Sequence, residues 1–253
     1  MSAWIIAHRG AMAEAPENTR AAFDRAVERS VDGIEFDVQL SRDGVPVVFH
    51  DQSLEKINGS SRSVSFYTYA ELGRMDWGGW FSGAFAGEPI LTLDQVLLRY
   101  GGRTRLLVEI KAGGGEGAFA TAKELAEVVP ARIRALVPLE RWNQMMIVSF
   151  SADVLAMAAA SAPELVYGQN LLCDPDSVPG GMQDLNAYLS AVSLPFAGIT
   201  TGFVRRCHER RLWAMTYSCN TPGQAESALH MGIDVIMTDA PASVNTLAGR
   251  RQL

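Results

Sequence analysis

Short apolar runs alternate with amphipathic stretches along nearly the whole chain. Runs rich in branched and aromatic residues are typical of buried strands, whereas apolar positions three to four residues apart indicate helices. Their regular alternation favours a parallel sheet covered by helices. Eight strands are expected, at Trp4–Ala7, Gly33–Gln39, Leu106–Ile110, Met145–Phe150, Val166–Gln169, Ala191–Leu194, Trp213–Ser218 and Val235–Thr238.

A helix is expected to accompany each of these strands. Eight βα units in 253 residues favour one closed (βα)8 TIM-type barrel domain over residues 1–253, since such barrels need about 250 residues. An open doubly wound sheet is the alternative, but no G-x-G-x-x-G follows the first strand. The expected helices are Glu17–Arg29, Leu93–Tyr100, Gly117–Leu136, Ala152–Ala160, Gly181–Leu189, Gly202–Arg211, Pro222–Met231 and Ala242–Leu247.

A cap-like insertion after the second strand, at about residues 51–89, interrupts this alternation. It has no long helical pattern, and irregular segments of this length are usually functional. Just before it, Asp43-Gly44 predicts a two-residue hairpin turn that sets His50 opposite Asp37, or beside Glu35 after a shift.

Aromatic residues are concentrated in this insertion, which predicts a cap over the barrel mouth. For Trp80 and Phe81, contact with the substrate and packing inside the cap are equally favoured. Packing inside the cap is favoured for the others, which are Phe66, Tyr67, Tyr69, Trp77 and Phe85.

Composition narrows the class of protein further. The chain is 48% hydrophobic and 20% charged with a mean hydropathy of +0.05, which excludes disorder and a membrane bundle. A net charge of −6 argues against nucleic acid as a partner. The absence of a leader pattern and of a long apolar run predicts a soluble cytoplasmic protein without stable membrane insertion. Its three cysteines, without a pairing pattern, are expected to be reduced thiols.

Acidic residues lie at the ends of two predicted strands. Glu35 and Asp37 share one face of the second strand, and Glu109 and Lys111 share one face of the third. Three carboxylates in a dry interior repel one another unless a cation lies among them. An all-oxygen ligand set selects a hard divalent ion, which is Mg²⁺, Ca²⁺ or Mn²⁺.

Two of the four histidines, His8 and His50, fall at the same predicted mouth. An imidazole can exchange a proton near neutral pH, so the pair suits acid–base catalysis; the alternative is that the histidines bind the metal. Arg9 and Lys111 add positive charge for phosphate oxygens. The combination indicates phosphoryl chemistry.

These residues form motifs that resemble the glycerophosphodiester phosphodiesterase family, including its small cytoplasmic bacterial members. The resemblance extends over nearly the whole chain, with motifs in the family's order and spacing. They are His8-Arg9-Gly10, Pro16-Glu17-Asn18-Thr19, Glu35-Phe36-Asp37, Asp43-Gly44, His50-Asp51, Glu109-Ile110-Lys111 and Thr238-Asp239.

The resemblance implies metal-dependent hydrolysis of small glycerophosphodiesters, such as glycerophosphocholine or glycerophosphoethanolamine, to glycerol 3-phosphate and an alcohol. By motif position, one divalent cation is held by Glu35, Asp37 and Glu109, and phosphate by Arg9 and Lys111. His8 is favoured as the base and His50 as the acid. Asn18 and Tyr217 are expected near the substrate.

Two other functions are weighed against this one. A phospholipase D-like or phosphoinositide-headgroup phosphodiesterase on the same barrel is disfavoured because no basic amphipathic helix is evident. A non-catalytic phosphodiester-binding protein is disfavoured because all three acids and both histidines are present. Cys219 departs from the family pattern after Tyr217 and is expected to be a small buried residue, although a position near the site could confer sensitivity to thiol reagents.

Overall fold

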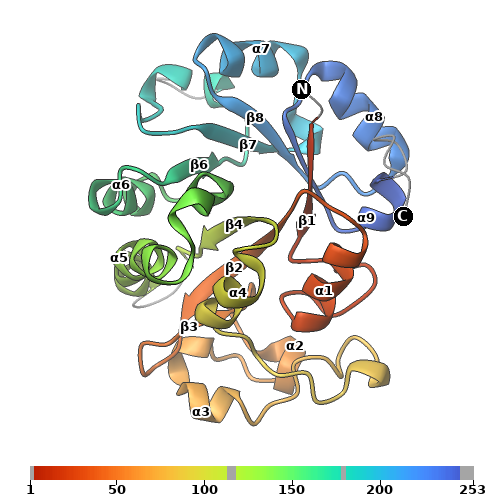
Figure 1. Ribbon diagram of the computed structural model, residues 1–253, viewed down its shortest axis with the longest axis vertical. Helices are drawn as coiled ribbons and strands as arrows, with labels where there is room; N and C mark the ends of the chain where they lie inside the picture. The colour runs from red at the N-terminus through yellow and green to blue at the C-terminus, as the bar shows by residue number, and fades with distance from the viewer. Residues whose placement is uncertain (1–2, 113–117, 178–180, 246–253) are drawn as a thin grey trace.

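Eight parallel strands close into a barrel in the computed structural model, which describes residues 3–112, 118–177 and 181–245. The ring closes because β1 pairs with both β2 and β9 (Figure 1). The predicted TIM-type barrel is therefore confirmed. Its strands are β1 Trp4–His8, β2 Gly33–Leu40, β4 Arg105–Ile110, β5 Met145–Ser149, β6 Val166–Asn170, β7 Ala191–Pro195, β8 Trp213–Tyr217 and β9 Val235–Thr238.

Helices surround this ring, and threonine side chains mark where several of them begin. Thr19, Thr92, Thr200 and Thr221 each accept a hydrogen bond from a backbone N–H of the first helical turn. The first helix consequently begins three residues later than expected. The helices are α1 Arg20–Glu28, α4 Leu93–Tyr100, α5 Ala118–Leu136, α6 Ala152–Ser161, α7 Thr201–Glu209, α8 Pro222–Met231 and α9 Pro241–Val244.

The prediction of a helix at Gly181–Leu189 is wrong. Only a 3₁₀ turn forms there, at Gly181–Asp184. Asp and Asn side chains in such a segment compete for backbone groups, as when Asp176 Oδ1 accepts the Met182 N–H at 3.0 Å. Within the described residues, β6 is therefore followed by short turns instead of a helix.

A ninth strand, β3 Pro46–Val48, lies outside the ring and pairs antiparallel with β2. The predicted register is wrong by one residue, because Val38 pairs with Val48 and Phe49 donates its N–H to the Asp37 carbonyl at 3.1 Å. The turn is longer than two residues, since the Ser41 N–H bonds the Val45 carbonyl around a left-handed Gly44 (φ +76°).

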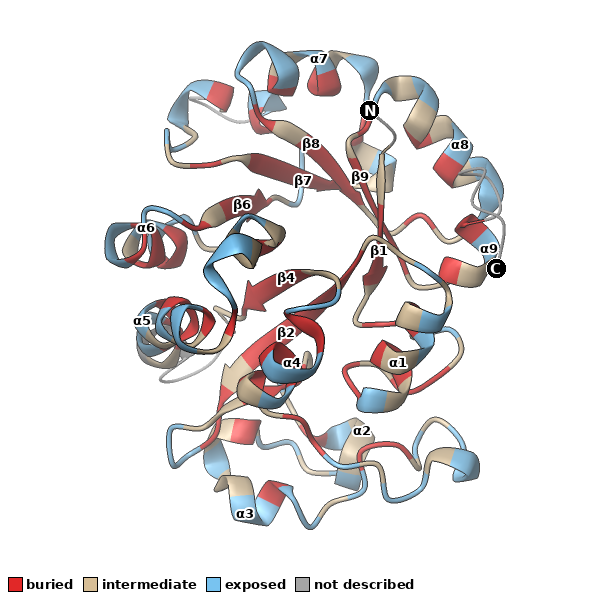
Figure 2. Cartoon of the chain, in the orientation of Figure 1, coloured by how far each residue is buried: buried red, intermediate tan, exposed pale blue. Residues whose placement is uncertain are grey.

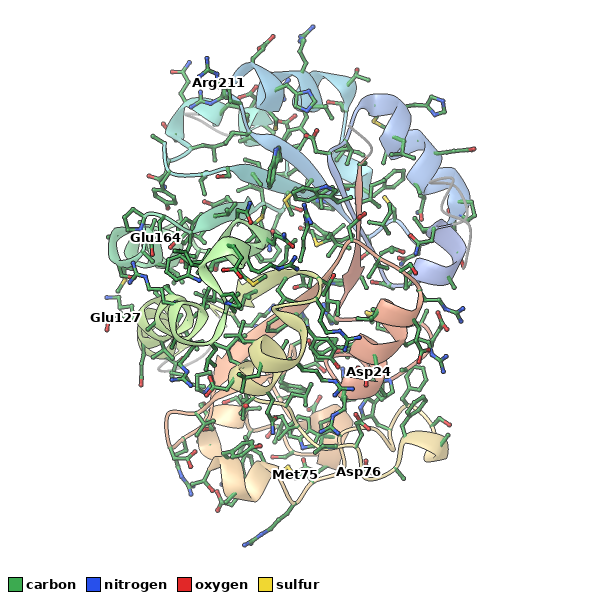
Figure 3. All side chains as sticks on the ribbon, viewed as in Figure 1. Asp24, Met75, Asp76, Glu127, Glu164 and Arg211 are labelled. Atoms are coloured by element: carbon green, nitrogen blue, oxygen red, sulfur yellow. The ribbon has the colours of Figure 1, made fainter. Side chains whose placement is uncertain are left out.

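The insertion after β3 packs around a small hydrophobic cluster of its own. It contains the short helices α2 Glu55–Asn58 and α3 Tyr69–Leu72. Asp76, labelled in Figure 3, organises its loop by accepting backbone N–H groups of Gly78, Gly79 and Gly87. The cluster comprises Val47, Phe49, Leu54, Val64, Leu72, Trp77 and Ile90.

Two further apolar clusters hold the barrel together. The larger one lies between the strands and the helices, and the smaller one lies inside the barrel. Figure 2 shows that the barrel strands are largely buried. Position 33 requires glycine because a Cβ there would lie 2.7 Å from the Arg105 carbonyl oxygen and 2.8 Å from Ile6 Cδ1. Among the described residues, no helix is long and apolar enough to cross a membrane.

Tyr167 provides a test of how β6 is anchored to α6. Its buried hydroxyl donates to the carbonyls of Ala158 and Ala162, at 3.0 and 2.8 Å. We expect Tyr167→Phe to lower the free energy of unfolding by about 1 kcal/mol in urea titrations, because the buried hydrogen bond between β6 and α6 is lost, although both carbonyls keep a backbone N–H donor. Tyr188→Phe removes a more exposed hydroxyl, 3.3 Å from the Ala152 carbonyl, and is the control. Equal losses in both variants would contradict this assignment.

Candidate active site

The site continues the inward face of the barrel strands. Ile6 and Leu107 belong to the apolar cluster inside the barrel, and two residues further along the same strands stand His8 and Glu109. Because successive side chains alternate between faces, these polar groups point the same way as the core residues before them. They lie at the carboxyl ends of the strands, which is where barrel enzymes place their catalytic groups.

Strand pairing brings the three predicted acids together. Asp37 on β2 is the register partner of Glu109 on β4, while Glu35 is the partner of His8 on β1. One oxygen from each of the three acids lies within 4.8 Å of the others. Their exposure is 2% for Glu35, 1% for Asp37 and 7% for Glu109, so water contributes little to stabilising their charges.

The charges of these acids disfavour one another. Burial, together with the negative charges of Asp37 and Glu109, raises the pKa of Glu35 to about 8. Burial and the charge of Asp37 also raise the pKa of Glu109. Burial opposes ionisation of Asp37 as well, but the charges of Lys111 and Arg9 outweigh burial and lower the pKa of Asp37, so this acid stays ionised. A buried carboxylate beside two acids that resist ionisation is suited to a divalent cation, and the all-oxygen donor set fits a hard ion.

Two cationic side chains flank the cluster on either side of Asp37. Arg9 Nε lies 3.5 Å from Asp37 Oδ2, and Lys111 Nζ lies 3.4 Å from Asp37 Oδ1. Lys111 also donates to Glu109 at 2.8 Å. Burial lowers the pKa of Lys111, but the charges of Asp37 and Glu109 outweigh that effect and raise it, so the ammonium stays charged.

Unusual backbone geometry after β1 places Arg9 and Asn18. Arg9 and Asn18 have φ values of +52° and +59°, and Gly10 has φ +82°. A Cβ on Gly10 would lie 2.7 Å from the Ala22 carbonyl carbon, so only glycine allows α1 to pack this closely. Asn18 is buried and donates to Asp37 Oδ2 at 2.9 Å, which fixes that carboxylate.

His8 is held by groups that follow the last two strands, β8 and β9. Its Nδ1 lies 2.6 Å from Asp239 Oδ1, and Asn220 Nδ2 donates to the other oxygen of Asp239, also at 2.6 Å. His8 Nε2 lies 3.9 Å from Glu35 Oε2. Burial lowers the pKa of His8, but the Asp239 hydrogen bond and the charge of Glu35 prevail and raise it.

His50 is held in a similar way by its chain neighbour. Its Nδ1 lies 2.8 Å from Asp51 Oδ1, and Lys56 of the insertion donates to Asp51 Oδ2 at 2.8 Å and to Glu17 Oε1 at 3.0 Å. Glu17, His50 and Asp51 form a second group with metal-ligand spacing. Lys56 pairs with both of these carboxylates and Arg9 also pairs with Glu17, so this group is less suited to a metal cation than the first.

A cleft of about 810 Å³ opens beside this centre. Among its lining residues are His50, Glu109 and Lys111, whereas His8 and Glu35 are not. The two histidines therefore differ in their surroundings: His50 borders the open cleft, and His8 lies on the side of the carboxylates where β1 meets β9.

The predicted aromatic contacts have mixed outcomes. Phe66 was expected inside the cap, but it is 55% exposed and lines the cleft, so that prediction is wrong. Trp80 packs on Phe81 with ring centroids 5.8 Å apart and lies under the Lys56 ammonium. Tyr217 donates its hydroxyl to the Leu171 carbonyl at 2.9 Å. Neither Trp80, Phe81 nor Tyr217 lines the cleft.

Several residues of the site were quoted only within motifs or not singled out at all. Asp239 and Asn170 follow or end strands, the same signal that identified the acids; Asn170 donates to Glu109 Oε2 at 3.1 Å. Lys56 lies in the insertion, where no periodic sequence pattern predicts the direction of its side chain. These groups hold the catalytic candidates in place by hydrogen bonds.

The cysteines give a further prediction. Cys219 is fully buried next to Asn220, as expected of a small core residue, and burial raises the pKa of Cys219 and of Cys207 to about 12. Cys173 is exposed. We expect a coloured thiol reagent to modify one thiol per folded chain and all three in denaturant. Cys173→Ser should remove the fast reaction; fast labelling of Cys219 would contradict its burial.

A closed barrel with acidic, histidine and basic side chains at the carboxyl ends of its strands defines a barrel enzyme, and comparison with known proteins identifies its family. The model of the glycerophosphoryl diester phosphodiesterase family matches residues 8–243. A glycerophosphodiester phosphodiesterase of Caldanaerobacter subterraneus subsp. tengcongensis is 31% identical over 248 residues, covering 98% of each chain. The YhdW protein of Bacillus subtilis (strain 168) is 49% identical over 108 residues, 43% of this chain and 44% of the relative.

Solved structures agree. The Oleispira antarctica phosphodiesterase, in complex with the product sn-glycerol-3-phosphate, superposes with a TM-score of 0.86 and 25% identity, covering 98% of this chain and 97% of that one. A glycerophosphodiester phosphodiesterase from Agrobacterium tumefaciens str. C58 has a TM-score of 0.78 and 27% identity, covering 98% of this chain and 100% of that one. The chain belongs to the glycerophosphoryl diester phosphodiesterase family and is a hydrolase.

Proposed function

We propose that this enzyme hydrolyses soluble glycerophosphodiesters to glycerol 3-phosphate and an alcohol, using one divalent cation and two histidines. The observation that carries the proposal is the buried cluster of Glu35, Asp37 and Glu109, with His8 and His50 beside it. The Oleispira relative was solved with the product sn-glycerol-3-phosphate, which supports this product for the present chain.

The three carboxylates hold the cation in this proposal, and Mg²⁺ or Ca²⁺ fits their oxygen donors, with Mn²⁺ as a third choice. When bound, the cation polarises a phosphoryl oxygen and balances charge that develops in the transition state. Arg9 and Lys111 bind the remaining phosphate oxygens, since each carries donors that extend beyond its contact with Asp37.

His8 is assigned as the general base. With Nδ1 donating to Asp239, the neutral imidazole leaves Nε2 able to accept a proton. Its raised pKa makes it a stronger base than an ordinary histidine. It takes the proton of the nucleophile, which in this proposal is the 2-hydroxyl of the glycerol group. Attack of that oxygen on phosphorus gives a cyclic phosphate, which water then opens.

His50 is assigned as the general acid. It borders the cleft, where the departing alcohol can be accommodated, and Asp51 orients its ring through Nδ1. Protonation of the leaving oxygen by His50 completes cleavage of the phosphorus–oxygen bond. After the cyclic phosphate forms, the deprotonated His50 is positioned to activate the water that opens it.

The test is release of glycerol 3-phosphate from glycerophosphocholine and glycerophosphoethanolamine by metal-stripped enzyme. We expect no release until Mg²⁺, Ca²⁺ or Mn²⁺ is added. If lysophospholipid is cleaved and soluble diesters are not, the enzyme is instead a phosphodiesterase of lipid headgroups; if the intact diester stabilises the protein but is not cleaved, the chain is a binding protein.

A further inference from the structure

The insertion presents a row of hydroxyl groups to the cleft beside His50. Ser61, Ser63 and Ser65 come from one short segment and all line the cleft. Val64 between them is completely buried in the insertion's hydrophobic cluster, which anchors the segment. Ser63 and Ser65 share a hydrogen bond of 2.6 Å, and because a hydroxyl both donates and accepts, each retains capacity for another partner.

The barrel adds polar groups to the same cleft. Thr121 of α5 and Ser151 after β5 line it, and the insertion also contributes Gln52. A cleft lined by hydroxyl and amide groups from both the insertion and the barrel can satisfy several hydroxyls of a bound alcohol at once. Its position next to His50 places these groups where the proposed leaving alcohol lies.

Two exposed aromatic rings complete the walls. Phe66 is 55% exposed and Phe150 is 41% exposed, and both line the cleft. Exposed aromatic rings in a cleft are typical of ligand contact, and here they provide flat apolar surfaces for the C–H faces of a ligand. Arg62 already stacks on Phe66, with its guanidinium 5.7 Å from the ring centroid. That positive charge disfavours a second cation on the same ring.

The lining carboxylates are also committed to other partners. Asp51 binds His50 and Lys56, and Glu109 binds Lys111. Among the described lining residues, no carboxylate without such a partner remains to neutralise the ammonium group of choline or ethanolamine. Hydroxyl groups on the alcohol would instead meet donors and acceptors of matching type.

We propose that this cleft is the subsite for the alcohol and that it selects a neutral polyhydroxylated alcohol, such as glycerol or inositol, over an aminoalcohol. The inference rests on the proposed function, because it assumes that the diester phosphate lies at the carboxylate cluster. It deepens that function by naming the substrate class.

The experiment compares kcat/KM for glycerophosphoglycerol and glycerophosphoinositol with kcat/KM for glycerophosphocholine and glycerophosphoethanolamine. We expect the better polyol diester to exceed both aminoalcohol diesters by about tenfold or more. Ser63→Ala/Ser65→Ala should lower kcat/KM for the polyol diester by about tenfold, since two hydrogen bonds are lost, and change that for glycerophosphocholine by about twofold or less.

Ser60→Ala is the matched control. Ser60 precedes the same segment, but its hydroxyl bonds the Tyr67 hydroxyl at 3.0 Å and does not line the cleft. We expect this variant to keep the preference of the parent enzyme.

Three results would overturn the inference. An aminoalcohol diester could be the better substrate of the parent enzyme, or the double variant could lose activity equally on all diesters; either result leaves the proposed function intact. Failure to cleave any of the four diesters with any divalent cation would overturn the proposed function as well.

Discussion

Replacing His50 by alanine should lower kcat for glycerophosphocholine by on the order of 10²-fold or more, because the departing alkoxide loses its proton donor. On a glycerophosphodiester of nitrophenol, whose oxygen leaves without protonation, the same variant should release nitrophenol in the first, cyclising step at most of the parent rate, although its opening of the cyclic phosphate should stay slow. His50 borders the cleft and His8 does not, so this rescue should be specific to His50. Single-turnover release of choline and of nitrophenol measures it.

His8→Ala is the matched comparison. We expect a loss of similar size on both substrates, since the nucleophile must still lose its proton whatever the leaving group. Rescue of His8→Ala in place of His50→Ala would reverse the two assigned roles. Near-normal rates for both variants on both substrates would remove the histidines from the mechanism. Thermal unfolding of each variant shows whether the loss reflects chemistry or folding.

The fold was predictable because the signals that produce it are local. A strand buried on both sides reads as a short apolar run, and each barrel strand lies within a residue or two of its expected position. The signals failed where local side-chain bonding decides the conformation. Asp176 bonding Met182 replaces an expected helix with a turn, and the left-handed Gly44 lengthens the hairpin turn and shifts the register.

The same distinction applies to the site. Glu35, Asp37, Glu109 and His8 could be identified because each follows an inward-facing strand position. The bond from Asp239 to His8 could not, because it spans 231 residues and exists only once β9 pairs with β1. The contact of Lys56 with Glu17 depends on an insertion whose path follows loop hydrogen bonds rather than periodicity.

The acid cluster yields the other large effect, which concerns both activity and stability. Stripping divalent cations should lower turnover by about 10²-fold or more, since charge compensation by a metal contributes several kcal/mol to the transition state. Saturating Mg²⁺, Ca²⁺ or Mn²⁺ at about 100 times the dissociation constant should stabilise the fold by about 2.7 kcal/mol. For a chain of this size that corresponds to a rise in Tm of about 5–10 °C.

Glu35→Gln separates the two consequences because it keeps the shape of the side chain and cannot ionise. Without metal at neutral pH, the variant should be at least as stable as the parent, since burial and the charges of Asp37 and Glu109 raise the pKa of Glu35 to about 8 and make the parent take up a proton when it folds. Its Tm should no longer rise with divalent cations, and turnover should be lost. Glu127→Gln, on the exposed face of α5 (Figure 3), is the control and should retain both responses. If neither the Tm nor the turnover of the parent enzyme changes when divalent cations are removed or added, the three acids do not bind a catalytic cation.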